Sequence, residues 1–257
     1  MNKGLEFRTD AEIAKLTFAR PEKMNAISHE MWSAIPDVVA EVEADPTVKV
    51  LVVTGTGGQF SAGADIGEFR TLRSTAEGAA AYDRAVTAAV RALTTMRKPS
   101  IAMIHGNCIG GGCQLAVACD FRFAATDATL GITPAKLGIV YDFTSTRQLV
   151  TLVGPAHARY LLLSARLVDA RRAAEMGLVN EVFDPDELEK TTMEFARTLC
   201  ERSQVSIRGM NEIIERILEG QRESDAEVER IRSEAVRSAD YAEGVAAFLE
   251  RRPPRFN

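Results

Sequence analysis

The chain has 257 residues, of which 46 % are hydrophobic and 26 % are charged, with a formal net charge of −5. This composition is typical of one large globular domain, or of one domain with a helical extension. The acidic balance argues against nucleic acid as the main partner, because phosphate binding needs a basic surface.

The first half of the chain alternates between strand and helix patterns. Strands are predicted at residues 11–18, 48–54, 100–105 and 121–124, and helices at residues 28–44, 77–97 and 113–119. The valine-rich segment 48–54 is typical of a strand buried on both faces of a parallel sheet. Ser28 is suited to cap the first helix, and Pro36 should kink that helix or begin a second one. The alternation favours an α/β fold.

The second half is mostly helical from Thr144 onward. Helices are predicted at residues 171–176, 186–202, 205–218 and 225–251. Gly177 follows the first of these helices and is expected to end it. No repeat of solenoid length and no low-complexity linker occurs in the sequence, so one α/β core with helices after it is the expected organisation.

Two glycine-rich segments follow buried strands. GNCIGGG at residues 106–112 precedes a helix, and FSAGADIGEF at residues 60–69 lies after the valine-rich strand. Free N–H groups at a helix start attract an anion, but neither segment is a G-x-G-x-x-G or P-loop motif. Two such loops at one sheet edge can direct two N–H donors at one oxygen and form an oxyanion hole. The alternative is that the glycines serve only close packing of helix and strand.

The cysteines and the N-terminal sequence argue against a metal- or disulfide-stabilised protein, a secreted protein and a membrane protein. Cys108, Cys113, Cys119 and Cys200 have no C-x-x-C spacing, so free buried thiols and no metal site are expected. There is no apolar signal core at the N-terminus, and no apolar run reaches the roughly 18 residues of a membrane span. We expect a cytoplasmic protein without a membrane partner.

The chain resembles the crotonase (enoyl-CoA hydratase/isomerase) superfamily over almost its whole length. The matching stretches are RPEKMNAIS (20–28), FSAGADI (60–66), KPSIAMIHGNCIGGGCQLAVACD (98–120), LVTLVGPAHARYLLLSARLVDARRAAEMGLVNEVF (149–183) and YAEGVAAFLERRPPRF (241–256). The resemblance implies a ClpP-like spiral of ββα units with a C-terminal helical region. It divides the chain into an acyl-CoA-binding core at 1–195 and a trimerisation or lid region at 196–257. It also implies an acyl-CoA substrate, no cofactor beyond the coenzyme A of that substrate, and a homotrimer or dimer of trimers.

The same resemblance assigns roles to residues. The backbone N–H groups of Ala64 and Gly111 would hold the thioester oxygen as it becomes an enolate. Contacts with coenzyme A are implied for Lys23, Ala26, Ala62, Ala64, Asp65, Ile66, Gly67, Gly110, Gly111, Pro134 and Gly138. Asp65 is also expected to cap a short helix after the oxyanion loop.

Both hydratase glutamates of the family are replaced. Gln114 stands three residues after the oxyanion glycine, and Ala135 stands after the proline of TPAKLG. A carboxamide cannot act as a general base, and a methyl group cannot transfer protons. Ordinary hydration of crotonyl-CoA is therefore not expected.

Tyr141 is the first candidate for replacement chemistry. The run ITPAKLGIVYD (132–142) resembles methylmalonyl-CoA decarboxylases, which have tyrosine at this position but histidine where Ala64 stands. Loss of CO₂ from a malonyl-type thioester gives the same enolate without a base, and Tyr141 or water would supply the proton afterwards. Decarboxylation is the favoured expectation. The alternative is a half-buried core tyrosine whose hydroxyl bonds a backbone carbonyl.

Asp142 is the second candidate. Its position matches the aspartate that acts as a base in dienoyl-CoA isomerases of the family, so an isomerase, or a relaxed hydratase, is the alternative activity. The residue is equally suited to cap a helix that begins near Phe143, and the two uses are compatible. A third hypothesis, from another class, is a catalytically inactive acyl-CoA-binding protein.

Overall fold

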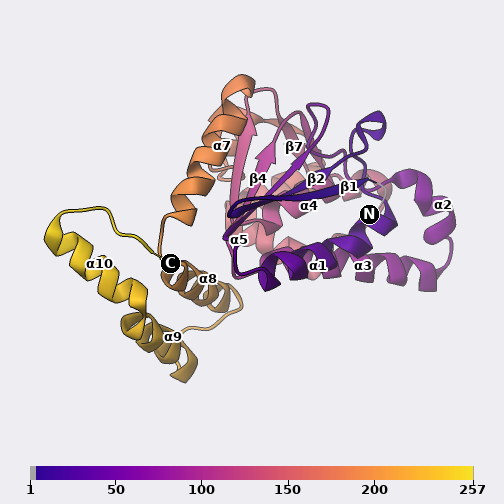
Figure 1. Cartoon of the computed structure of the whole chain (residues 1–257). Coiled ribbons are helices and arrows are strands. Elements are labelled where there is room, and N and C mark those ends of the chain that lie inside the picture. The colour runs from indigo at the N-terminus through magenta and orange to yellow at the C-terminus, as the bar shows by residue number, and fades with distance from the viewer. Residues whose placement is uncertain (1–3, 257) are drawn as a thin grey trace.

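A six-stranded sheet forms the centre of the protein in the computed structural model, which describes residues 4–256 (Figure 1). In sheet order its strands are β1 (Leu5–Asp10), β2 (Ile13–Phe18), β3 (Val50–Gly55), β4 (Ser100–Ile104), β6 (Phe121–Ala125) and β9 (Glu181–Phe183). β1 and β2 are antiparallel, and every other pair is parallel, with Ile13 opposite Val50 and Phe123 opposite Glu181. A smaller sheet has the order β5 (Asn107–Ile109), β7 (Thr129–Gly131), β8 (Val168–Asp169).

Helices cover both faces of the large sheet. The helices are α1 (His29–Ala44), α2 (Phe69–Leu72), α3 (Ala76–Thr94), α4 (Gly111–Ala118), α5 (Phe143–Ser164), α6 (Ala170–Glu175), α7 (Pro185–Cys200), α8 (Gln204–Leu218), α9 (Ala226–Arg237) and α10 (Ala239–Glu250). Leu51 and Val53 belong to the core cluster that includes α1 and α4, whereas Val50 and Val52 belong to the cluster that includes α7. The mixed α/β fold is confirmed, and the unbroken hydrophobicity of β3 follows from its burial on both faces.

The expected start of α1 is confirmed, and no second helix begins at Pro36. The Oγ of Ser28 accepts a hydrogen bond from the N–H of Met31 at 3.2 Å. The helix then continues through Pro36 to Ala44. A proline removes one backbone hydrogen bond, and here burial of Trp32 and Ile35 against the sheet offsets that loss.

Three further features of the helices and strands are not predicted by the sequence. The helix predicted at 225–251 is two helices, because Ser238 adopts an extended conformation (ψ 157°) that ends α9, and its Oγ accepts from the N–H of Tyr241 to begin α10. Strand β1 was not predicted, because its side chains are mostly polar and exposed and carry no hydrophobic signal. Helix α5 contains a break at Gly154, whose φ of 74° and ψ of 163° lie outside the helical region.

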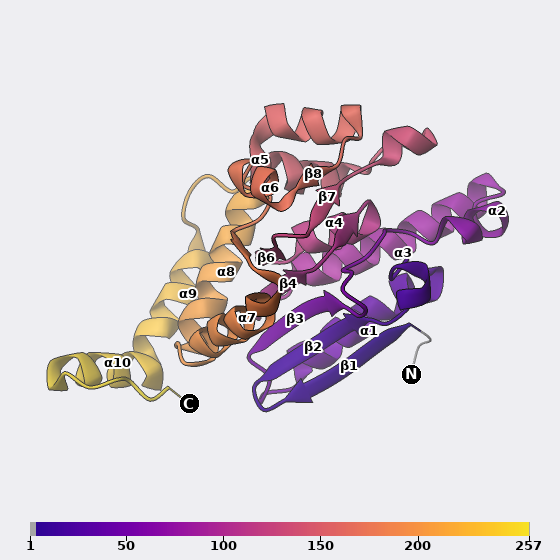
Figure 2. The same cartoon turned by 90° about the horizontal axis from the view of Figure 1, so that it is seen from above.

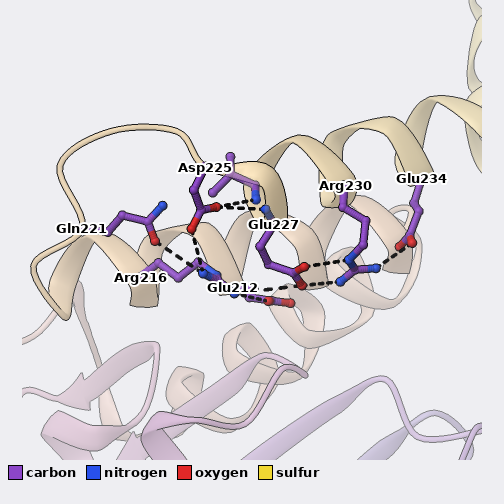
Figure 3. Close-up of polar contacts among 8 residues, drawn as sticks. Glu212, Arg216, Gln221, Asp225, Glu227, Arg230 and Glu234 are labelled. Atoms are coloured by element: carbon purple, nitrogen blue, oxygen red, sulfur yellow. Dashed lines mark hydrogen bonds and ion pairs between the residues drawn. The ribbon is translucent and has the colours of Figure 1, made fainter.

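The C-terminal helices α9 and α10 extend away from the sheet, as both views show (Figures 1 and 2). Charged side chains join α8 to α9 (Figure 3). The guanidinium of Arg216 lies 3.5 Å from Glu212 and 3.6 Å from Asp225, and Arg230 pairs with Glu227 and, at 2.6 Å, with Glu234. Partly exposed ion pairs stabilise little individually, so this network mainly fixes the orientation of the two helices. No helix within residues 4–256 has the length and apolarity required to cross a membrane.

Candidate functional site

The two glycine-rich loops lie side by side and are joined by backbone hydrogen bonds. The N–H of Ser61 donates to the carbonyl of Asn107 at 2.8 Å, and the N–H of Ile109 donates to the carbonyl of Ser61 at 2.9 Å. On the other side of this loop, the N–H of Ile27 donates to Gly63 at 2.7 Å. These bonds hold the backbone before Ala64 against the strand that leads into α4.

Ala64 and Gly111 therefore meet at the start of α4. A Cβ on Gly111 would lie 3.5 Å from the backbone nitrogen of Ala64 and 2.7 Å from Cζ2 of Trp32, so only glycine fits there. Gly110 before it has φ 55° and ψ −119°, a conformation that side chains disfavour. Within residues 4–256, neither the N–H of Ala64 nor that of Gly111 donates to a protein acceptor. Two free donors on adjacent backbones are the geometry an oxyanion hole requires.

A cavity of about 670 Å³ opens beside these two residues. Its walls come from the oxyanion loop, α1, α3, the start of α4 and the segment 133–142. The residues singled out from the sequence that line it are Ala62, Ala64, Ile66, Gly110, Gly111, Gln114, Pro134, Tyr141 and Asp142. The structure thus brings both loops and both replacement candidates to one site.

Lys23 and Asp65 do not line this cavity, and each contacts the other. The Oδ2 of Asp65 lies 2.9 Å from Nζ of Lys23 and 2.9 Å from a guanidinium nitrogen of Arg20. Burial alone would raise the pKa of Asp65, but hydrogen bonds from Lys23 and Arg20 outweigh that effect and lower it. The Oδ1 of Asp65 accepts from the N–H of Gly67 at 3.2 Å, which confirms the expected cap.

Four further residues from the sequence assignment also lie outside the cavity wall: Ala26, Gly67, Ala135 and Gly138. The carbonyl of Ala26 accepts from Arg20 at 2.7 Å, and Ala135 is exposed on the short 3-10 helix Pro134–Leu137. Ala135 is therefore exposed and does not line the cavity, and its methyl group cannot transfer protons.

Gln114 is buried and bonds directly to Asp142. Its Nε2 donates to Oδ2 of Asp142 at 3.1 Å and to Oγ of Ser145 at 2.6 Å. Asp142 caps α5 as expected, since its Oδ1 accepts from the N–H of Ser145 at 2.9 Å. The carboxylate is therefore held at both oxygens while it borders the cavity.

Tyr141 is half-buried, packs against the hydrophobic core and lines the same cavity. Burial raises the pKa of its hydroxyl well above the usual value. The nearby carboxylate of Asp142 acts in the same direction, and a hydrogen bond with Ser145 opposes it. The group is accordingly a neutral hydroxyl at physiological pH. Such a hydroxyl can donate a proton in a hydrogen bond but is a poor base.

Sequence reasoning missed the far wall of the cavity. The Arg73 guanidinium lies 5.0 Å from the ring centre of Phe69 and 5.4 Å from that of Tyr82, and it pairs with Asp83 at 2.5 Å. Burial raises the pKa of Tyr82 to about 12. The spacing of Tyr82 and Val86 on the predicted helix 77–97 was the available signal, since residues four apart share a helix face.

The cysteines are free and buried, as expected. Within residues 4–256, no group of three or more His, Cys, Asp or Glu side chains is arranged to hold a metal ion.

Comparisons with known proteins agree with this geometry. A family model described as enoyl-CoA hydratase/isomerase matches residues 8–257. The chain is 34 % identical over 252 residues to a crotonyl-CoA hydratase of Syntrophomonas wolfei, covering 96 % of this chain and 95 % of that protein. It is 31 % identical over 262 residues to a peroxisomal Δ(3,5)-Δ(2,4)-dienoyl-CoA isomerase of Arabidopsis thaliana, covering 96 % and 94 %. A crystal structure of an enoyl-CoA hydratase/isomerase family protein from Hyphomonas neptunium superimposes with a TM-score of 0.96 at 35 % identity, covering 99 % and 97 %.

Proposed function

We propose that this protein isomerises a carbon–carbon double bond in an enoyl-CoA or dienoyl-CoA thioester. The proposal starts from the family: the chain belongs to the enoyl-CoA hydratase/isomerase family, which is part of the crotonase superfamily of acyl-CoA enzymes. One observation carries the proposal: the Asp142 carboxylate borders the cavity without a cationic partner among residues 4–256. The other carboxylate of the wall, Asp83, is paired with Arg73. The similarity to a dienoyl-CoA isomerase supports the same reaction.

The proposed reaction moves one proton. Asp142 removes a proton from C2, next to the thioester carbonyl, and the electron pair of that C–H bond is delocalised into the thioester oxygen. The N–H groups of Ala64 and Gly111 stabilise the resulting dienolate, and one such donor contributes about 10²–10³ in rate. Asp142 then returns the proton to C4, so the double bond moves from C3–C4 to C2–C3 and no water is consumed.

Hydration is less compatible with the site. Adding water needs one group that activates the water and one that protonates the carbon, and family hydratases use two glutamates for this. Gln114 has no basic oxygen, and Ala135 lies outside the cavity wall. Asp142 remains as one base, which is sufficient for a proton shuttle within a single substrate.

Decarboxylation of a malonyl-type thioester, the reaction first expected, is the second candidate. The neutral Tyr141 hydroxyl in the cavity supports it, because this group could protonate the enolate after CO₂ leaves. The Asp142 carboxylate in the same cavity opposes it, since two carboxylates a few ångströms apart repel each other. A malonyl-type substrate therefore fits the charges of this cavity less well than an uncharged acyl chain.

The remaining assignments are also proposals. We assign no cofactor beyond the coenzyme A of the substrate, with the oxyanion-loop residues Ala62–Gly67 along the coenzyme. The ammonium group of Lys23 is already paired with Asp65, so it would have to contact a coenzyme A phosphate while keeping that ion pair. A homotrimer or dimer of trimers, formed by the region 196–257, stays a prediction.

The test uses the purified protein and the Asp142→Asn variant. Each is incubated separately with a 3-enoyl-CoA, a 3,5-dienoyl-CoA, crotonyl-CoA and methylmalonyl-CoA, and products are identified by NMR and mass spectrometry. Asparagine is a good helix cap, so the fold should survive while isomerisation falls about 10²–10⁴-fold. Loss of CO₂ from methylmalonyl-CoA that is unaffected by Asp142→Asn would overturn the proposal in favour of decarboxylation. Tight binding without any turnover would make the chain an acyl-CoA-binding protein.

A further inference from the structure

Gln114 occupies the position that the resemblance assigns to a hydratase glutamate, and its side chain makes two specific hydrogen bonds. Its side chain is buried, with 5 % of the residue exposed, and Ser145 is 3 % exposed. Both protons of the Nε2 amide are used, one for Asp142 at 3.1 Å and one for Ser145 at 2.6 Å. A carboxylate accepts hydrogen bonds only, so this pairing requires the amide nitrogen to face Asp142.

We propose that Gln114 and Ser145 form a clamp that positions the Asp142 carboxylate and makes it the single proton acceptor of the cavity. This inference rests on the isomerisation proposed above. Gln114 also lines the cavity, but the role proposed for it and for Ser145 acts through Asp142, so both are positioning residues.

The clamp fixes both carboxylate oxygens from two elements. The N–H of Ser145, in the first turn of α5, bonds Oδ1 at 2.9 Å, and Gln114 of α4 bonds Oδ2. The Ser145 hydroxyl restrains Gln114 in turn. Rotation of the Asp142 side chain would break at least one of these bonds, so its orientation toward the cavity is set before substrate binds.

Positions 114 and 142 are therefore interdependent. An ionised glutamate at 114 would have no proton to donate and would place a second carboxylate about as close to Asp142 as the amide is now. Two carboxylates at that separation cannot both ionise readily, so one retains a proton. Glutamine at 114 keeps an N–H donor on Asp142 without adding a second carboxyl group that would compete for the same proton.

Other charged and titratable groups surround this clamp. Tyr141 lies next to Asp142 in the chain, and Cys113 of α4 lies close to Tyr141. Across the cavity are Lys136 of the 3-10 helix and the Arg73–Asp83 pair, whose charges offset each other. These groups are present in every variant below, so differences between the variants report on residue 114 alone.

The experiment compares Gln114→Glu, Gln114→Met and the wild type. Protein labelled with carbon-13 in the aspartate carboxyl groups is titrated by NMR, and the Asp142 signal is the one absent from Asp142→Asn. We expect Gln114→Glu to raise the Asp142 titration midpoint by about one pH unit or more, because of the added charge. Gln114→Met removes the donor without adding charge, so the expected rise is smaller. Gln221→Glu, the same change in the distant loop between α8 and α9, is the matched control and should leave the midpoint unchanged.

The pH dependence of isomerisation is measured on the same variants. Gln114→Met should lower kcat by about 10- to 100-fold, the effect of losing a hydrogen bond to a charged group, and Gln114→Glu should shift the acid limb of the profile to higher pH. Equal Asp142 midpoints in wild type, Gln114→Glu and Gln114→Met would overturn the clamp and leave Gln114 a packing residue. A shifted midpoint in a protein that isomerises nothing would uphold the clamp and refute the proposed function, so the two failures are distinguishable.

Discussion

The two halves of the site are built from different parts of the chain. The proposed oxyanion half consists of backbone N–H groups of Ala64 and Gly111, held by bonds between neighbouring loops. The proposed proton-transfer half consists of the side chains of Gln114, Tyr141 and Asp142 at the junction of α4 and α5. Backbone donors serve any reaction that passes through a thioester enolate, whereas the side chains decide where the proton goes. A family can thus keep the first half and change its reaction through the second.

The largest effect is expected from Gly111→Ala. The new Cβ would lie 2.7 Å from Trp32, so the backbone must shift and the Gly111 N–H leaves its position. We expect kcat/KM to fall about 10²–10³-fold on every thioester that the protein converts. Gly244→Ala in α10 is the control, because its Cβ would meet Phe256 at an ordinary 3.7 Å. A rate within about twofold of wild type would show that this N–H does not hold the oxyanion.

The next largest effect is expected on stability, from Asp65→Asn, because Asp65 directly follows Ala64 in the proposed oxyanion loop. Removing the charge leaves the partly buried guanidinium of Arg20 without its partner and should lower the free energy of unfolding by about 3 kcal/mol near pH 7, measured with urea. The pKa of Asp65 is lowered on folding, so its contribution is present above the unfolded value and is lost as pH falls through the folded one. The difference from wild type should therefore shrink below about pH 4.

The matched control for Asp65→Asn is Glu6→Gln. Glu6 pairs with Arg8 at 3.3 Å, and both side chains are largely exposed. Exposed pairs contribute about 0–1 kcal/mol, so this variant should unfold much like wild type. Equal losses in the two variants would mean that burial of the Arg20–Asp65 pair has no role in supporting the oxyanion loop.

The smallest effect is expected from Tyr141→Phe. Phenylalanine preserves the packing against the core, and the hydroxyl has no part in the proposed proton shuttle, so isomerisation should stay within about threefold of wild type. If the protein decarboxylates a malonyl-type thioester, loss of the proton donor should instead lower that rate about 10²-fold. Comparing the two rates in this one variant separates the two candidate reactions.

Local sequence signals predicted that two glycine-rich loops follow buried strands, and the structure places these loops side by side. Glycines after buried strands indicate close backbone approach wherever they occur, and the valine-rich strand and the Ser28 cap are equally local. Local sequence signals did not predict the structure where tertiary contacts decide where a helix ends or whether a strand forms. Ser238 divides the predicted helix 225–251 although no glycine or proline stands there, and the polar strand β1 forms because β2 is available to pair with it.

The sequence by itself determined the mixed α/β fold and the family, because these depend on residue identity and on patterns along the chain. It also led us to propose that both hydratase glutamates are replaced, at Gln114 and Ala135. Only the tertiary structure decided what the replacements do. Gln114 and Asp142 are 28 residues apart, and their hydrogen bond exists because α4 and α5 pack together. Tertiary packing likewise turned Asp65 toward Arg20 and Lys23 and left Ala135 outside the cavity wall. Side-chain direction across such distances is fixed by packing, which no local pattern encodes.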